Sequence, residues 1–168
     1  MDCAAAMSGF VTNERRLVLR VEDYWNHLRQ DRAFPRTADI DPVELDDDWC
    51  DCFVMNPCQP PEDAVFLFVG PRLLENARLP EDWSRSAERR ARDCPKDSML
   101  GRSVRHIGQV LQKRAPVSVA EVFEEAGEEV RLRGTLFPLS SNGRDIDAIL
   151  GAANCARQEA LRANQPTA

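Results

Sequence analysis

The stretch YWNHLRQDRAFPRTADIDPVEL, which runs from Tyr24 to Leu45, decides how the fold begins. It starts on the pattern of an amphipathic helix and continues into a run that contains Pro35 and Pro42. Proline breaks a helix, and the residue before a proline avoids helical backbone angles. The stretch therefore predicts a helix that ends near residue 34 and an extended connection to the first strand.

Charged residues in this stretch leave two interpretations open. The arginines and aspartates can pair with one another, which would make the stretch a structural collar between the helix and the sheet. They can instead present a surface to a partner. We favour the collar, in which each exposed ion pair contributes only ~0–1 kcal/mol.

The residues before Pro35 predict a leading helix over residues 13–34. Apolar side chains fall at Leu17, Val21, Tyr24 and Leu28, which is the spacing of one helical face, and Trp25 widens the stripe. Residues 1–12 are expected to be a disordered N-terminus. Such a stripe must be buried either in its own domain or in a second copy of the chain.

The rest of the chain predicts an α+β domain. Its expected elements are strands at 49–56 and 64–69, a short helix at 71–77, a helix at 98–114, and strands at 115–125, 128–140 and 145–156. Two strands, a helical middle and three more strands are typical of one five-stranded antiparallel sheet with helices on one face. The tail at 158–168 is expected to be a short helix that frays.

The opening stretch and the later stretch RGTLFPLSSNGRDIDAILGAAN, residues 133–154, carry a family resemblance. Together they resemble a family of single-domain PAS-like proteins of alphaproteobacteria, and the resemblance spans residues 24–157. It implies a PAS-like domain at 35–157 that acts in trans on a signalling partner, as a sensory or protein-interaction module without enzymatic activity. It also implies a homodimer through the leading helix, with interface residues Leu17, Val21, Tyr24, Trp25 and Leu28.

A ligand pocket, if the protein has one, is expected between the sheet and the helix at 98–114. Its candidate lining residues are Leu100, Val104, His106, Ile107, Leu111, Leu132 and Leu136. The placement of His106 resembles that of the proximal ligand in PAS domains that bind haem, so a haem or other small-ligand sensor is the alternative function. A helix-surface histidine is the simpler interpretation, and we expect no cofactor.

The cysteines offer two further candidate sites. Cys50 and Cys52 share one face of a predicted strand and Cys58 follows, but zinc sites normally have four ligands and a wider Cys-Cys spacing. We therefore expect buried thiols and no metal. Cys94 lies near Arg90, Arg92 and Lys96 in the sequence and is the best candidate for a redox-sensitive thiol.

Charge and hydropathy exclude several classes of protein. The net charge of −6 argues against a general nucleic-acid binder, which needs a basic face. We expect no membrane span and no signal peptide, and therefore a cytoplasmic protein. No Gly-x-Ser-x-Gly motif and no phosphate-binding glycine loop occur in the sequence, so we expect no enzyme.

Overall fold

The computed structural model describes residues 3–159, and for residues 3–15 it describes the backbone only. Helix α1 (Cys3–Arg29) leads the chain and ends where Gln30 adopts a left-handed backbone with φ 51°. The helix thus begins ten residues before the predicted start and includes residues that we expected to be disordered. Three consecutive alanines at 4–6 favour the helix in this segment.

The connection from α1 to the sheet is more compact than the predicted extended run. It contains η1 (Thr37–Asp39), α2 (Pro42–Leu45) and η2 (Asp46–Asp51). Pro42 occupies the first position of α2, where the missing N–H group costs nothing, and the Asp41 side chain caps the helix by accepting a hydrogen bond from the Val43 amide at 2.9 Å. Pro42 therefore begins the short helix α2, although proline was expected only to end a helix in this stretch.

One antiparallel sheet forms the centre of the molecule, with strands in the order β3-β2-β1-β6-β5-β4. The strands are β1 (Cys52–Asn56), β2 (Val65–Val69), β3 (Arg89–Arg90), β4 (Val117–Glu125), β5 (Glu128–Leu139) and β6 (Ala148–Glu159). Five of them match the predicted strands. The sixth, β3, has two residues and was missed, because a pair of charged residues joins the ladder through its backbone.

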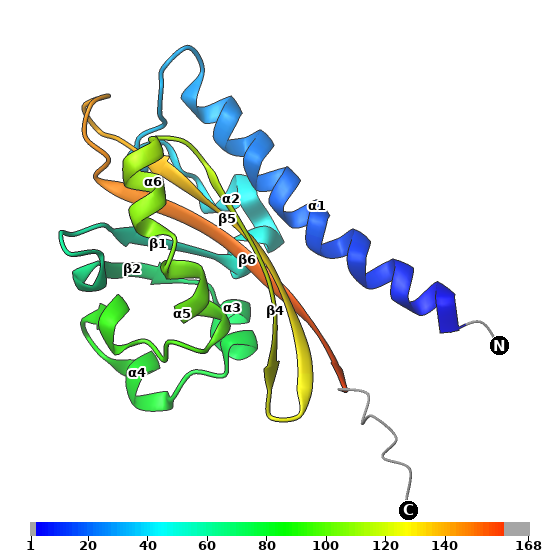
Figure 1. Ribbon diagram of the computed structural model, residues 1–168. Coiled ribbons are helices and arrows are strands. Elements are labelled where there is room, and N and C mark those ends of the chain that lie inside the picture. Colours follow the sequence, from blue (N-terminus) through cyan, green and yellow to red (C-terminus); the bar gives the residue numbers. More distant parts are fainter. Residues whose placement is uncertain (1–2, 160–168) are drawn as a thin grey trace, which may run out of the picture.

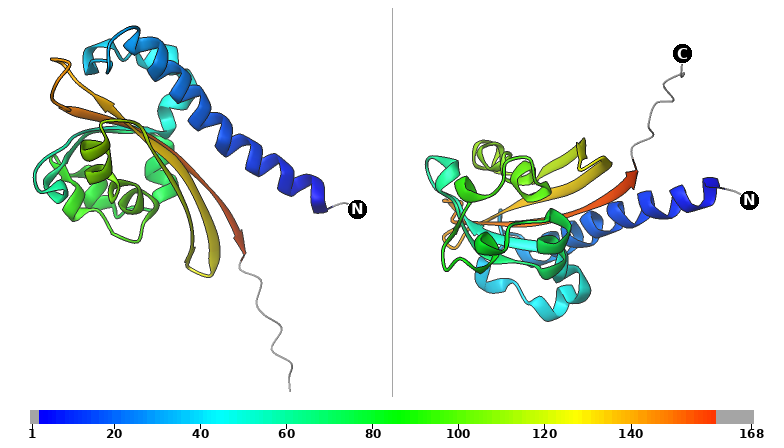
Figure 2. Two further views of the ribbon diagram at one scale, coloured as in Figure 1. Left: turned by 45° about the horizontal axis from the view of Figure 1, so that its top comes forward. Right: turned by 90° about the horizontal axis from the view of Figure 1, so that it is seen from below.

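The helices lie on both faces of this sheet (Figure 1, Figure 2). We call the face covered by the middle helices the inner face and the face covered by α1 the outer face. The middle elements are α3 (Pro71–Ala77), α4 (Glu81–Arg85), η4 (Ala91–Asp93), α5 (Met99–Val104) and α6 (Ile107–Lys113), while η3 (Pro61–Asp63) lies in the β1–β2 connection.

The helix predicted at 98–114 is two helices. Ser98 caps α5 by accepting a hydrogen bond from the Gly101 amide at 3.0 Å. The helix then breaks at His106, whose backbone lies at φ −91° and ψ 2°, and α6 begins at Ile107. The break leaves Ile107 and Val110 fully buried against the sheet.

Two hydrophobic clusters make up the core, one on each face of the sheet. The inner cluster contains Phe53, Met55, Phe66, Leu73, Trp83, Met99, Leu100, Ile107, Val110, Leu132, Leu136 and Ile149, among others. The outer cluster contains Leu17, Val21, Trp25, Phe34, Leu45, Val54, Phe137, Leu139 and Leu150, among others. Gly151 of β6 lies opposite Phe53 of β1, and a Cβ at Gly151 would overlap the Phe53 ring.

Candidate functional site

The inner face brings together the residues that we expected to line a ligand pocket. Leu100, Ile107, Leu132 and Leu136 are at most 1% exposed, and Val104 and Leu111 pack against them. These side chains contact one another as part of the inner cluster. The expected location between the sheet and α5–α6 is therefore occupied by core packing in this structure.

His106 lies at the junction of α5 and α6 and faces strand β4. Its Nε2 atom is 3.7 Å from Oε1 of Glu121, and the other oxygen of that carboxylate accepts a hydrogen bond from Arg102 at 3.0 Å. The Arg102 guanidinium also lies 3.9 Å from the centroid of the Phe123 ring. Among the described residues, the buried Nε2 atom has no hydrogen-bond partner.

This setting does not fit a haem ligand. A proximal histidine needs an apolar pocket large enough for the porphyrin. His106 instead has a carboxylate and a guanidinium beside it, and Leu100 of α5 and Ile107 of α6 are fully buried in the core. Haem could bind here only if the inner cluster opened.

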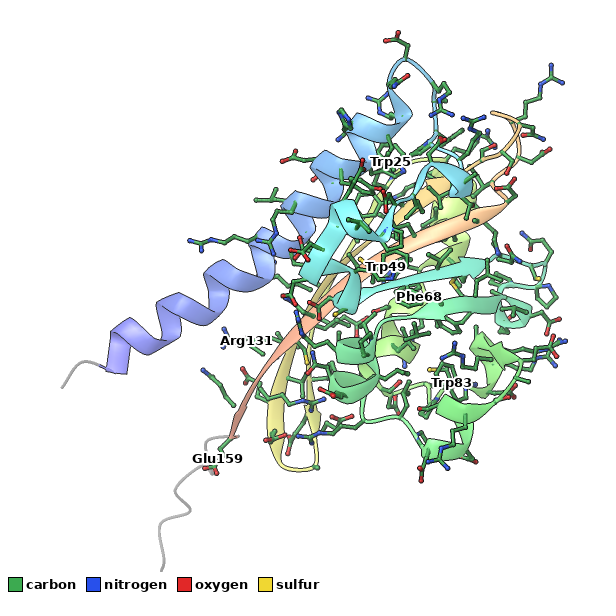
Figure 3. The ribbon with its side chains drawn as sticks, turned by 180° about the vertical axis from the view of Figure 1, so that it is seen from behind. Trp25, Trp49, Phe68, Trp83, Arg131 and Glu159 are labelled. Carbon is green, nitrogen blue, oxygen red and sulfur yellow. The ribbon has the colours of Figure 1, made fainter. Side chains whose placement is uncertain are left out.

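The outer face buries most of the stripe that we assigned to a dimer interface. Leu17, Val21 and Trp25 are 2%, 0% and 6% exposed, because they pack against β5 and β6 of their own chain. The Trp25 indole donates a hydrogen bond to the Pro138 carbonyl at 3.0 Å, and its ring lies 5.9 Å from that of Phe137. The assignment of these three residues to a dimer interface is wrong. Figure 3 shows Trp25 beneath α1.

Tyr24 and Leu28, the other two predicted interface residues, are half-buried. The Tyr24 hydroxyl accepts a hydrogen bond from the Asp41 amide at 2.8 Å, and partial burial raises the pKa of this tyrosine. This hydrogen bond joins α1 to the connection between α1 and the sheet.

Ion pairs within the opening stretch support the collar interpretation. Asp39 accepts hydrogen bonds from Arg32 at 2.8 Å and from Arg36 at 3.0 Å. The bonds from Arg36 and Arg32 hold the pKa of Asp39 well below its usual range. The charged residues around Asp39 are thus paired within the chain.

Aspartates just before β1 connect α1 to α3. Arg20 of α1 binds both carboxylate oxygens of Asp48 at 2.7 Å, and Arg72 of α3 binds Asp47 at 2.7 Å and Asp51 at 2.6 Å. Asp51 is 4% exposed, and its burial raises its pKa although Arg72 opposes the shift. Helices on opposite faces of the sheet therefore bind the same short segment, η2.

An exposed groove lies where α1 passes the edge of the sheet. Its volume is about 190 Å³, and its lining residues are Val18, Leu19, Ser118, Val119, Ala120, Arg133, Gly134 and Thr135. Leu19 is 57% exposed. Val122, which lies on the same face of β4 as Ser118 and Ala120, is 65% exposed. We call Leu19, Ala120 and Val122 the apolar edge.

Comparison with known proteins identifies the family. The family of PAS domains matches residues 14–154, which is most of the chain. The chain belongs to the PAS domain family. A search of curated proteins found no match.

Membership in this family confirms the resemblance read from the opening and closing stretches. The α+β fold with its antiparallel sheet is consistent with a PAS domain, and PAS domains are generally sensory modules rather than enzymes. The match to the PAS family begins at residue 14, so the first turns of α1 lie before the matched region and the rest of α1 lies within it. The predicted division of the chain at residues 34 and 157 stays a prediction.

The cysteines of this PAS domain do not gather as a metal site. Among the described residues, no group of three or more His, Cys, Asp or Glu side chains is placed to hold a metal ion. Burial raises the pKa of the Cys94 thiol to about 11 and also raises that of Cys52. A redox-sensitive thiol needs a lowered pKa and exposure, so the assignment of Cys94 to that role is wrong.

None of the helices in residues 3–159 is long and apolar enough to cross a bilayer.

The apolar edge was missed in the sequence, although a signal for it exists. An apolar residue in a strand is normally assigned to the core, but Val122 is out of phase with the buried Val117 and Val119. Its neighbours on the same face, Ser118 and Ala120, are small or polar, whereas Val117 and Val119 on the other face are buried. The contrast between the two faces of β4 marks Val122 as a surface residue.

Proposed function

We propose that this PAS domain is a non-enzymatic signalling module that acts in trans through protein contacts, and that it forms a homodimer through the apolar edge. The observation that carries the proposal is the exposure of Leu19 and Val122 beside an open groove. Exposed apolar surface around a groove is typical of a site for protein contact.

The course of α1 supports a partner at this place. At 1.5 Å per residue, a helix of 27 residues is about 40 Å long. From residue 16 onward, where the side chains are described, the buried ones of α1 lie between Leu17 and Trp25. Figure 2 shows the backbone of the earlier turns projecting past the sheet. Packing stabilises helices in proteins more than propensity does, and a second copy placed along α1 would give these turns a surface to pack on.

The geometry of β4 also supports a partner. It is the last strand of the sheet, so one side of its backbone has no neighbouring strand within the described chain. Edge strands of this kind can pair with another chain. The apolar edge and the open side of β4 lie together, so one partner can contact both.

The homodimer is tested by native mass spectrometry and light scattering. The chain has a mass of 19.0 kDa, and we expect twice that mass for the wild type. The double variant Leu19→Asp, Val122→Asp should be a folded monomer, because both side chains are exposed and neither contributes to the core. Val43→Asp is the matched control, since Val43 is 81% exposed but lies on α2. A wild-type monomer, or a double variant that keeps the dimer mass, contradicts the proposal.

The competing function is a sensor that binds haem through His106. One observation favours it, namely the buried Nε2 atom without a hydrogen-bond partner among the described residues. An absorption spectrum of freshly purified protein decides between the two. We expect no Soret band, and a Soret band that disappears in His106→Ala would establish the haem sensor instead.

A further inference from the structure

A cavity on the helical side of the molecule borders the inner cluster through Cys94 and lies apart from the apolar edge. Its volume is about 360 Å³. It is enclosed by the β1–β2 connection, η4, α5 and α6, and its lining residues are Pro61, Glu62, Ala91, Arg92, Cys94, Lys96, Gly101, Val104, Arg105 and Gly108. None of these residues belongs to a strand, and only Val104 is shared with the predicted ligand pocket. We call this space the helical-layer cavity.

The wall of the helical-layer cavity is aliphatic. Pro61, Ala91, Cys94 and Val104 contribute small apolar side chains. Gly108 on α6 has open space where a Cβ would stand, so that helix presents bare backbone to the cavity. No aromatic residue is among the lining residues, so the wall suits a flexible aliphatic group better than a flat ring.

The rim of the cavity is basic. Among the lining residues, Arg92, Lys96 and Arg105 outnumber the one carboxylate, Glu62. Asp63 and Asp97 lie beside the rim and pair with Arg92 and Arg105. Cations at the mouth of an apolar cavity attract an anionic head group.

The partners of these cations identify which one can take a ligand. Arg92 forms an ion pair with Asp63. Arg105 donates to the Lys96 carbonyl at 2.8 Å and lies 3.3 Å from Asp97. The Lys96 ammonium has no ion pair or hydrogen bond within the described part of the chain. The contact of Arg105 with the Lys96 backbone places two cations side by side at the rim.

We propose that the helical-layer cavity binds a small amphipathic anion, with its aliphatic body against Val104 and Gly108 and its carboxylate or phosphate group on Lys96 and Arg105. The volume lies within the range of about 300–1,000 Å³ that is usual for small-molecule sites. Binding would join the β1–β2 connection to α5 and α6. The inference goes beyond the proposed function, because self-association does not require this cavity.

Octanoate is the probe, since it has an eight-carbon chain and one carboxylate. Binding is followed by chemical shift changes in amide NMR spectra. We expect saturable changes that include Gly101, Val104 and Gly108, and none with octylamine, which has the same chain and the opposite charge. Inorganic phosphate tests the head group alone, and phosphate that binds as tightly as octanoate overturns the amphipathic ligand.

Two variants test the two halves of the cavity. Lys96→Glu with Arg105→Glu reverses the charge of the rim, and Gly108→Leu fills the apolar space. Each should weaken octanoate binding at least about tenfold, which corresponds to ~1.4 kcal/mol. These residues are exposed, so we expect the variants to fold.

Lys113→Glu is the matched control, because it makes the same charge change on α6 outside the lining residues. Octanoate affinity should be unchanged in this variant. Absence of octanoate binding to the wild type, or equal affinity in all variants, overturns the proposal.

Discussion

The inner and outer faces of the sheet bury similar apolar clusters but are covered in different ways. Four helices and several turns cover the inner face, whereas one helix, α1, and the short segments after it cover the outer face. A single straight helix cannot cover the whole width of a twisted sheet. The uncovered strip on the outer face contains the apolar edge, and the helical-layer cavity lies on the helical side. The protein contact that we propose therefore lies on the outer face, and the small-ligand site that we propose lies on the helical side.

The aromatic side chains display the same contrast. Trp83 on the inner side meets Phe66 edge-to-face, with ring centroids 5.6 Å apart, as part of a continuous apolar layer. On the outer side Trp49 stacks on Phe68 with centroids 4.3 Å apart, where η2 crosses the strands. Figure 3 shows Trp49 and Phe68 side by side and Trp83 well away from them. The outer cluster therefore joins the opening segments to strands β5 and β6 near the end of the chain.

The largest expected effect tests whether the outer cluster is as essential as the inner one. Leu17→Ala on the outer face and Leu100→Ala on the inner face should each lower the free energy of unfolding by about 2–5 kcal/mol, because both leucines are fully buried. The measurement is urea denaturation followed by circular dichroism.

Val43→Ala provides the control for this comparison. Val43 is 81% exposed and lies outside both core clusters and the apolar edge, so its loss should change stability by less than about 0.5 kcal/mol. If Leu17→Ala costs no more than Val43→Ala, α1 does not stabilise the domain and the two faces are not equivalent.

A smaller difference in the free energy of unfolding is expected between variants of the two buried tryptophans, Trp25 and Trp83. The Trp25 indole N–H donates to the Pro138 carbonyl, whereas the Trp83 indole N–H is buried without a partner among the described residues. Trp25→Phe should cost about 0.5–1.5 kcal/mol more than Trp83→Phe, because only the first removes a hydrogen bond. Thermal denaturation of the two variants gives the difference. Equal losses would mean that the hydrogen bond of Trp25 does not contribute to stability.

The smallest effect concerns the collar on the outer side. The pKa of Asp39 is lowered in the folded state by Arg36 and Arg32, so the stabilisation is complete above the unfolded pKa near 3.8 and is lost as the pH falls towards the folded pKa. Asp39→Asn should therefore be less stable than the wild type at pH 7, and the gap should shrink below about pH 4.

The check is urea denaturation of both proteins from pH 7 to pH 3. Asp41→Asn is the control, because an asparagine at that position can still cap α2. A gap between Asp39→Asn and the wild type that stays constant over this range would contradict the role of the ion pairs.

Periodicity in the sequence predicted which residues are buried, but not what buries them. The spacing of Leu17 and Val21 correctly marked an apolar face, and a stripe has the same pattern whether it packs on its own sheet or on a second chain. The alternation of Val130, Leu132 and Leu136 likewise predicted the strand that became β5. Pairing partners far apart in the sequence leave no local signal, so the order of the strands came from the structure.

Short elements were the least predictable. The break at His106 depends on how Ile107 and Val110 reach the sheet, and no proline marks it. The two-residue strand β3 lies in a highly charged segment whose side chains give no strand pattern. The helical-layer cavity could not be foreseen for the same reason, since it is formed where η3, η4 and the two short helices meet.

The contact between Phe53 and Gly151 also constrains how this sequence can change over evolutionary time. The ring of Phe53 rests on the bare backbone of Gly151 across the β1–β6 pair. A larger residue at 151 can be accepted only after position 53 has become smaller, so the order of substitutions matters. Descendants of this chain should carry a larger residue at 151 only where position 53 is already smaller.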